Sequence, residues 1–424
     1  MELQRFSSTG FSSDYSNHHN QTSLSSQPSL ASVPSLNNNN YYSCSNNYPT
    51  ASHNCIATLK GNNYYTSSLT LSSKFLYTGS SDREIRSWSK QSLLTTTTTN
   101  VVLAGKGAVK SLVVHSDKLF SAHQDNKIRV WKITNTVNNN QDQDQDHDHE
   151  QKYTHLATLP TLSDRVLKLL LPKNHVRIRR HKKSTWVHHV DAVSCLALSR
   201  DGVLLYSVSW DRTIKIWRTR DFACLESVMN AHDDAINAVA VSNDGRVYTG
   251  SADKRIKVWM KGEKSSKSKK KNKHYLLNTL EKHKSGINAL ALNGDGSLLY
   301  SGACDRSILV WAKEEEEERG EGGGGGGGDG KMVVVGALRG HGRSILCLVV
   351  VMDFVVSGSE DKTIRVWRGF GGRGYSCVAV LEGHRGPIKS LTAMVDDPSE
   401  ASFVVYSGSL DCDIKVWKVF VPLL

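Results

Sequence analysis

The chain has 424 residues, a formal net charge of +12 and a hydrophobic content of 38%. Its longest apolar stretch, Ile345–Val356, is interrupted by Asp353 and is shorter than the roughly 20 residues of a membrane-spanning helix, so we expect no such helix. The eight cysteines include no Cys-x-x-Cys pair and the first residues show no apolar signal-peptide core, so we expect no zinc motif and a reduced cytoplasmic or nuclear location.

The first 53 residues are rich in Ser and Asn and show no apolar periodicity. Segments of this composition bury too little apolar surface to offset the entropy lost on ordering. We therefore expect residues 1–53 to form a disordered tail.

From residue 54 onward, one pattern of four residue types occurs seven times. Ser or Thr is followed after four residues by Asp, and Ile and Trp come three and six residues after that Asp. The Asp and Trp pairs are Asp82/Trp88, Asp125/Trp131, Asp211/Trp217, Asp253/Trp259, Asp305/Trp311, Asp361/Trp367 and Asp411/Trp417. Apolar and polar residues alternate within Asp253–Trp259, which is typical of a β-strand. The pattern predicts an all-β fold of stacked repeats.

The repeat resembles the WD40 family, whose unit is a four-stranded blade of a β-propeller. Five units also carry the family's histidine, between 20 and 27 residues before the Asp. The resemblance implies a seven-bladed propeller over residues 54–421, in which His, Ser or Thr, Asp and Trp form one buried hydrogen-bonded set per blade. The five complete sets are His189, Ser207, Asp211 and Trp217; His232, Thr249, Asp253 and Trp259; His283, Ser301, Asp305 and Trp311; His341, Ser357, Asp361 and Trp367; and His384, Ser407, Asp411 and Trp417. Asn62 and Gly105 replace the histidine in the first two units, where we expect weaker networks.

The two ends of the repeat region complement each other. Only seven residues follow Trp417, and Pro422 is among them, so the last unit lacks a fourth strand. At the other end, Cys55–Gly61 matches Cys377–Gly383, a strand that leads into the last unit. We expect residues 54–60 to complete blade seven and to close the ring.

Four insertions interrupt the repeats. The low-complexity segments 134–152, 261–273 and 312–331 follow repeat tryptophans and are predicted to be flexible loops between the third and fourth strands of their blades. The fourth insertion, residues 161–185, is basic, because residues 165–183 hold eight Lys and Arg and no acid. We predict that it begins with a short helix ended by Pro172 and lies beside the central channel. We place it on the face that carries the histidines and the Asp turns, which we call the top face.

Residues beside the first core position of each inner strand, or just before the Asp turn, are predicted to form a partner-binding surface on the top face. These residues are Tyr65, Lys110, Gln124, Trp210, Asn237, Asn288, Glu360 and Lys389. Trp210 lies outside the repeat pattern, and an exposed Trp beside Lys is a typical interface anchor. The alternative is that Trp210 packs under the basic insertion, and we expect Trp186 to be a packing residue.

The sequence predicts no catalytic, cofactor-binding or metal site. His, Ser and Asp recur at the same offsets in successive units, which favours a structural network over a catalytic triad. His147 and His149 lie among carboxylates in a low-complexity segment, and flexible ligands do not preorganise a metal site. Gly322–Gly328 lacks the Lys and Ser or Thr of a phosphate-binding loop.

Three runs look like the plant Jingubang-type WD40 proteins, namely Asp191–Leu198, Leu205–Trp217 and Cys224–Asn237. Arg179–His181 and Trp186 extend the similarity. The resemblance implies a non-catalytic regulatory protein of plants, with the family's role in restraining pollen germination and tube growth.

We therefore predict a monomeric scaffold whose top face binds a protein partner with an acidic segment. The alternative is binding of nucleic acid or another anionic surface through the basic segments 165–183 and 261–273, which would weaken steeply with salt. We rank this alternative second, because few aromatic residues lie among these charges to stack on bases. A ubiquitin-ligase adaptor motif is not expected, because no Asp follows any of the seven repeat tryptophans.

Overall fold

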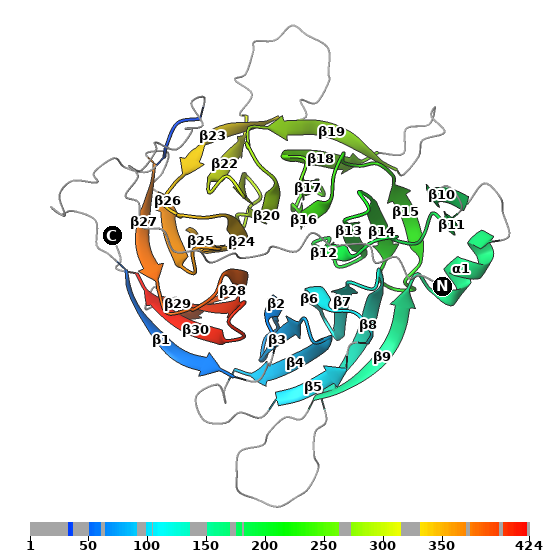
Figure 1. Ribbon diagram of the computed structural model, residues 1–424, viewed down its shortest axis with the longest axis horizontal. Helices are drawn as coiled ribbons and strands as arrows, with labels where there is room; N and C mark the ends of the chain where they lie inside the picture. The colour runs from blue at the N-terminus through cyan, green and yellow to red at the C-terminus, as the bar shows by residue number, and fades with distance from the viewer. Residues whose placement is uncertain are drawn as a thin grey trace, which may run out of the picture. The chain divides into compact units, whose positions relative to one another are not determined.

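The computed structural model contains seven four-stranded antiparallel sheets that stand in a ring (Figure 1). The innermost strands of successive sheets contact one another around the ring, and β28 of the last sheet contacts β2 of the first. The predicted all-β, seven-bladed propeller is therefore confirmed. The structure describes one part of the compact unit Val33–Leu424, namely residues 33–36, 51–60, 64–90, 99–103, 105–135, 151–169, 175–179, 182–262, 273–314, 331–369, 374–397 and 402–421.

Each blade runs from an inner strand at the channel to an outer strand at the rim. Blade one consists of β2 (Thr66–Leu71), β3 (Phe75–Ser80), β4 (Glu84–Ser89) and β5 (Thr99–Leu103). Blade two consists of β6 (Val109–His115), β7 (Lys118–His123), β8 (Ile128–Asn135) and β9 (Gln151–Leu159). Blade three consists of β12 (Val193–Leu198), β13 (Leu204–Ser209), β14 (Ile214–Arg218) and β15 (Cys224–Val228). Blade four consists of β16 (Ile236–Val241), β17 (Val247–Ser251), β18 (Arg255–Lys261) and β19 (His274–Glu281).

The remaining three blades have the same order. Blade five consists of β20 (Ile287–Leu292), β21 (Leu298–Ala303), β22 (Ile308–Lys313) and β23 (Met332–Leu338). Blade six consists of β24 (Ile345–Val351), β25 (Phe354–Ser359), β26 (Ile364–Gly369) and β27 (Tyr375–Leu381). Blade seven consists of β28 (Ile388–Asp397), β29 (Ser402–Ser409), β30 (Ile414–Phe420) and β1 (Ser52–Leu59).

The strand that completes blade seven comes from the opposite end of the repeat region. β1 pairs with β30 in antiparallel register, with Cys55 opposite Trp417 and Leu59 opposite Ile414. The outer strand of the last sheet thus precedes the first sheet in the chain. This pairing joins the two ends of the repeat region within one blade.

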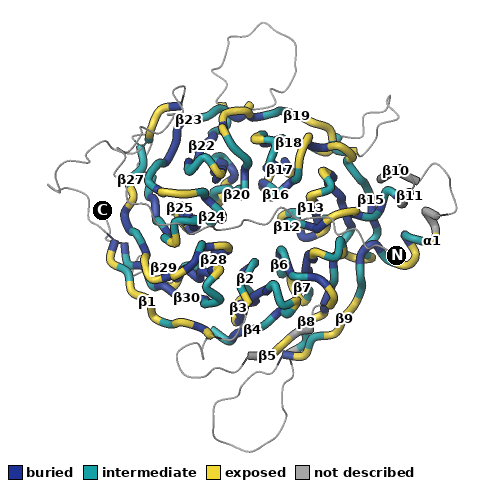
Figure 2. The backbone as a smooth tube through the Cα atoms, viewed as in Figure 1, coloured by how far each residue is buried: buried dark blue, intermediate teal, exposed yellow. Residues whose placement is uncertain are grey.

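Adjacent blades share an apolar core at each junction. Tyr206 and Ile216 of blade three pack in one cluster with Ile236 and Trp259 of blade four. The equivalent cluster at the closing junction includes Trp88 of blade one together with residues of blade seven. Figure 2 shows buried residues along the inner and middle strands and many exposed residues on the outer strands β1, β9 and β19. The repeat tryptophans in these clusters pack between adjacent blades, and burial of their large apolar surface stabilises the stacking of one blade on the next.

The strands extend further into the three predicted loops than the sequence suggested. Thr134 pairs with Lys152 at the end of β8 and β9, and Lys313 pairs with Met332 at the end of β22 and β23. β18 also includes Lys261. The predicted loops 134–152, 261–273 and 312–331 are therefore too long at their ends, because ladder pairing continues beyond the repeat tryptophan. Their central parts, residues 136–150, 263–272 and 315–330, lie outside the described residues.

Residues 1–53 were expected to form a disordered tail, but two parts of this segment are ordered. Ser52 and His53 belong to β1, and Val33–Leu36 is bound to the outer strand of blade five through a bridge between Ser35 and Ala337. The physical reason is that an unpaired strand edge offers backbone groups to any nearby extended segment. Residues 1–32 and 37–50 lie outside the described residues.

The basic insertion does begin with a short helix, but it does not lie beside the channel. Helix α1 (Leu162–Leu169) starts after Thr161, whose Oγ1 accepts a hydrogen bond from the Asp164 amide at 3.2 Å, as in an N-cap. The Asp164 carboxylate accepts from the amide of Cys224 in the outer strand β15 at 3.1 Å. The chain then forms a hairpin of β10 (His175–Arg179) and β11 (Lys182–Thr185).

Figure 1 places α1, β10 and β11 outside the ring, beyond β15. The prediction of a lid beside the channel is therefore wrong for these elements. The reason is that the chain leaves β9 at the rim, and Asp164 ties the insertion to the next outer strand before it can turn inward.

Candidate partner-binding site

The turns of the top face are held by the repeated hydrogen-bonded sets. In blade four, Trp259 Nε1 donates to Thr249 Oγ1 at 2.9 Å, His232 Nε2 lies 2.8 Å from that hydroxyl, and His232 Nδ1 lies 2.8 Å from Asp253 Oδ2. The other four complete sets have the same contacts, around His189, His283, His341 and His384. Every set fastens the loop that enters the blade to the turn between its two middle strands.

The ionisation states in these sets follow from burial and from the paired charges. Burial lowers the pKa of His189, His341 and His384 despite the opposing effect of their Asp partners, so these rings are neutral at pH 7. Each Nδ1–H then donates to a carboxylate and each Nε2 accepts from a hydroxyl. Burial alone would raise the pKa of Asp253, but the hydrogen bond and charge of His232 outweigh it and lower the pKa to about 2.

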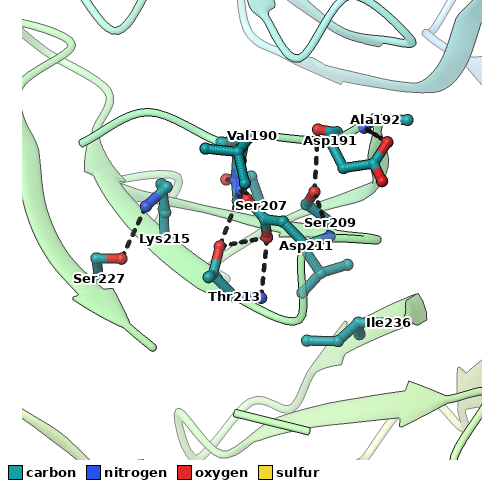
Figure 3. A network of polar contacts seen from close by, with 12 residues as sticks. Val190, Asp191, Ala192, Ser207, Ser209, Asp211, Thr213, Lys215, Ser227 and Ile236 are labelled. Carbon is teal, nitrogen blue, oxygen red and sulfur yellow. Dashed lines mark hydrogen bonds and ion pairs between the residues drawn. The ribbon is translucent and has the colours of Figure 1, made fainter. Parts of the chain in front are cut away.

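Blade three adds a buried lysine that the sequence analysis did not single out. Lys215 on β14 has no exposed surface, and its Nζ donates to the carbonyl of Trp186 at 2.5 Å and to Ser227 Oγ at 2.8 Å. Figure 3 shows Lys215 beside Ser227 and, next to it, the Asp211 turn bonded to Thr213. Trp186 packs against the neighbouring apolar cluster, in line with the packing role expected for it. The acceptor comes from a distant loop, so no local sequence signal marks Lys215.

Blade two contains a histidine in a position that the repeat pattern does not include. His123 lies at the end of β7, two residues after Ser121, with Nε2 2.8 Å from Ser121 Oγ and Nδ1 3.0 Å from the carbonyl of Gly107. Trp131 Nε1 donates to the same Ser121 hydroxyl at 3.0 Å. Blade two, for which a weaker network was expected, thus obtains its histidine–serine contact from another position, while Asp125 pairs with Arg129 and not with the histidine. In blade one, Trp88 Nε1 donates to Thr78 Oγ1 at 3.1 Å, and Asn62 lies outside the described residues.

Six of the eight predicted partner-binding residues line one cavity at the top end of the channel. The cavity has a volume of about 310 Å³, and these six are Tyr65, Lys110, Trp210, Asn237, Asn288 and Lys389. Lys110, Asn237, Asn288 and Lys389 are the second residues of their inner strands. Tyr65 directly precedes β2, and Trp210 lies in the turn between β13 and β14. Gln124 and Glu360 occupy the turns equivalent to that of Trp210 but do not line the cavity, and Glu360 forms an ion pair with Arg343 at 3.3 Å.

Lysine charge is concentrated at this cavity. The Nζ of Lys110 lies 5.2 Å from the centroid of the Trp210 ring, a cation–π distance, while 40% of the Trp210 surface stays exposed. Burial and the nearby charge of Lys389 both lower the pKa of Lys110. The two ammonium groups therefore repel each other, and an anion bound between them would relieve that repulsion.

The two asparagines predicted to bind a partner, Asn237 and Asn288, connect adjacent blades. Asn237 Nδ2 donates to the carbonyl of Ile287 at 2.9 Å, and Asn288 Nδ2 donates to that of Ile345 at 2.8 Å, so each side chain bonds to the inner strand of the next blade. Ser67 and Ser194 make the equivalent bonds in blades one and three. Lys110 and Lys389 occupy the same strand position in blades two and seven, and both residues line the cavity.

Within the described residues, no cluster of His, Cys, Asp or Glu has the geometry to hold a metal ion. No helix among them is long and apolar enough to cross a membrane. The lining of the cavity brings two lysines, an aromatic ring and two amide side chains to one opening.

Known proteins resemble the chain in both sequence and fold. The crystal structure of the WD40 beta propeller domain of Doa1 superimposes with a TM-score of 0.58 at 20% identity, covering 86% of this chain and 96% of that one. Protein ROOT INITIATION DEFECTIVE 3 of Arabidopsis thaliana is 29% identical over 197 residues, 43% of this chain and 40% of that protein. The CCR4-associated factor 4 homolog of Candida glabrata is 27% identical over 226 residues, 49% of this chain and 36% of that protein. The aligned regions thus span less than half of these two curated relatives.

The family model for the WD domain, G-beta repeat, matches six segments of the chain. They are residues 53–89, 180–218, 223–260, 274–312, 332–368 and 375–418, together more than half of the sequence. Blade two falls in the gap between the first two segments, which agrees with its displaced histidine His123. The chain belongs to the WD40 family.

Proposed function

We propose that this protein is a non-catalytic scaffold that binds an acidic segment of a partner protein at the top end of its channel. The observation that carries the proposal is the placement of Lys110, Lys389 and the half-exposed Trp210 around one opening. Among the ion pairs of the described residues, neither lysine has a carboxylate partner. A carboxylate-bearing partner would supply the missing counter-charge, and Trp210 would supply the apolar anchor.

The biological setting that we propose is a regulatory complex of plants, in the cytoplasm or the nucleus, such as one that restrains pollen germination and tube growth. The resemblance of blades three and four to the Jingubang-type proteins supports this setting, and so does the similarity to Protein ROOT INITIATION DEFECTIVE 3 of Arabidopsis thaliana. We propose that the propeller acts as a monomer, because blade seven and the junction between blades seven and one are completed within one chain.

Affinity capture with mass spectrometry tests this function through the triple variant Lys110→Ala, Trp210→Ala, Lys389→Ala. We expect the triple variant to lose the partners that the unchanged protein captures, while its thermal melting stays within a few degrees. The matched control is Lys118→Ala with Lys132→Ala, which removes two lysines at the opposite end of the neighbouring strands β7 and β8 and should keep those partners. Equal capture by the triple variant and the unchanged protein would contradict the proposal.

The competing proposal is binding of nucleic acid or an anionic surface through the basic segments. It predicts that binding survives the triple variant, falls steeply between about 50 and 200 mM salt, and disappears when the charges of residues 165–183 are neutralised. Capture by the triple variant and by a chain in which residues 165–183 are neutralised therefore separates the two functions. The hairpin of β10 and β11 supports this alternative by its basic sequence. Most of the other basic segment, residues 263–272, lies outside the described part of the chain.

A further inference from the structure

The tail segment Val33–Leu36 adds a short parallel strand to the free edge of β23 in blade five. The amide of Leu36 donates to the carbonyl of Ala337 at 2.9 Å, and the amide of Ala337 donates to the carbonyl of Pro34 at 2.9 Å. Two further bonds fix the segment at its ends. Arg339 Nη2 donates to the carbonyl of Val33 at 3.0 Å, and the amide of Tyr375 in blade six donates to the carbonyl of Leu36 at 2.8 Å.

The side chains of the segment divide between the protein and solvent. Val33 is only 4% exposed, whereas Pro34 and Ser35 point outward. Leu36 packs against the apolar cluster that joins blades five and six, together with Tyr375. It also lines a cavity of about 750 Å³ between these two blades. The segment therefore combines backbone hydrogen bonds to a strand edge with one buried and one half-buried side chain, and in peptide recognition by strand addition such side chains give the specificity.

Blade five carries a glycine where the other blades have a side chain. Gly336 lies opposite Val310 in β22, and a Cβ atom built on Gly336 would stand 2.3 Å from Cγ of Leu36. The residues at the same register in the other six outer strands are Ala57, Asn100, Ala157, Glu226, Asn278 and Ala379. The backbone of Gly336 has no positive φ that would require glycine. The glycine therefore serves to make room for the leucine.

We propose that this edge of β23, with the Val33 and Leu36 pockets, is a recognition site for extended peptides of the sequence type Val-Pro-x-Leu, and that the chain's own tail occupies it. Proline suits the second position, because that residue only accepts a hydrogen bond, from Ala337. A partner carrying the same pattern would exchange with the tail. The tail competes at the high effective concentration of a tethered ligand, on the order of millimolar, so the site responds to partners that are abundant or multivalent.

The experiment empties the site in the full-length chain and refills it from solution. The variant Leu36→Asp places a charge in the apolar pocket and leaves the ring unchanged. A fluorescent peptide of residues 31–38 should bind this variant at least tenfold more tightly than it binds the unchanged protein, as measured by anisotropy. Hydrogen exchange gives a second readout, since the Ala337 amide should lose protection in Leu36→Asp and regain it when the peptide is added.

The chain offers its own control peptide. Residues 25–32 contain the same Pro-Ser-Leu as residues 34–36, but Gln27 stands where the bound segment has Val33. Because Val33 is buried, the control peptide should bind at least tenfold more weakly. Equal binding of the two peptides would overturn the role of the Val33 pocket.

A second pair of variants tests the pocket itself. In the Leu36→Asp chain, the further change Gly336→Val should abolish peptide binding, whereas Asn278→Val at the same register of blade four should not. The proposal is overturned if a folded Leu36→Asp chain, checked by circular dichroism, fails to bind the peptide or binds it equally well with Gly336→Val. A dimer of the unchanged protein that requires Leu36, detected by light scattering, would show instead that the occupant comes from a second copy and would contradict binding of the tail in its own chain.

Discussion

The histidine of blade two differs from the other five in the group that its Nδ1–H contacts. His123 donates to the carbonyl of Gly107, whereas the others donate to an aspartate. A carbonyl stabilises an imidazolium less than a carboxylate does, and burial lowers the pKa of His123 to about 4. Asp125, freed from the histidine, forms an ion pair with Arg129 at 2.5 Å.

These pKa values predict how stability depends on pH. A histidine with a lowered pKa binds fewer protons in the folded than in the unfolded protein, so its contribution is complete above pH 6.5 and is lost as the pH falls towards 4. The lowered pKa values of Asp253 and Asp305, both about 2, cause a further loss below pH 3.8. We expect the urea midpoint to be constant from pH 7 to 8 and to fall steadily below pH 6.5.

The variant His123→Asn measures how much His123 contributes to the pH dependence of the free energy of unfolding. Asparagine has no titratable group, so the decline between pH 6.5 and 4 should become shallower by about one proton, equivalent to roughly 1.4 kcal/mol per pH unit. At pH 7.5 the variant should also be less stable by about 1–3 kcal/mol, because Ser121 or Gly107 loses its partner. An unchanged slope would show that folding does not lower the pKa of His123.

At the scale of elements, β1 has the largest predicted effect on stability. It pairs with the edge of β30 from Ser52 to Leu59. Most of its side chains are exposed or half-buried, so β1 stabilises the ring mainly through its backbone hydrogen bonds to β30. Removing residues 1–60 should destabilise the whole ring by on the order of 5 kcal/mol, from about 1 kcal/mol per lost ladder hydrogen bond. Calorimetry tests this by comparing the melting temperature of the chain that lacks residues 1–60 with that of a control chain that lacks only residues 1–32. The same melting temperature for both truncated chains would contradict it.

The elements that the sequence predicted are those specified by short, repeated patterns. The Asp–Trp spacing, the alternation in the strands and the match of Cys55–Gly61 to Cys377–Gly383 locate the strands without knowledge of distant contacts. Val33–Leu36 was missed because four residues carry no periodicity, and the segment is ordered only by the edge of β23. The position of α1 was missed because it depends on one bond from the Cys224 amide to Asp164.

At the scale of the whole molecule, residues around the channel connect one blade to the next. Asn237→Ala and Asn288→Ala should each cost about 1 kcal/mol of stability, since each removes a hydrogen bond to the next inner strand. Lys110→Ala and Lys389→Ala should cost less than about 0.5 kcal/mol. Chemical denaturation of the four single variants checks this division. Equal losses would mean that the lysines also hold the ring together.

The candidate site was predictable in part, and for a similar reason. The offset from the first core residue of each inner strand identifies which side chains face the channel, so six of the eight predicted residues line one cavity. The offset does not say whether a polar side chain faces a partner or the next blade. That depends on its length, and Asn237 reaches the carbonyl of Ile287 in the adjoining blade.

The most direct test of partner binding at the channel is hydrogen exchange of the protein with and without a captured partner. If the top end of the channel is the binding site, exchange should slow in the peptides that contain Lys110, Trp210 and Lys389 and remain unchanged in the outer strands β9, β15 and β19. Slower exchange confined to the hairpin of β10 and β11, or to the rim, would contradict binding at the channel.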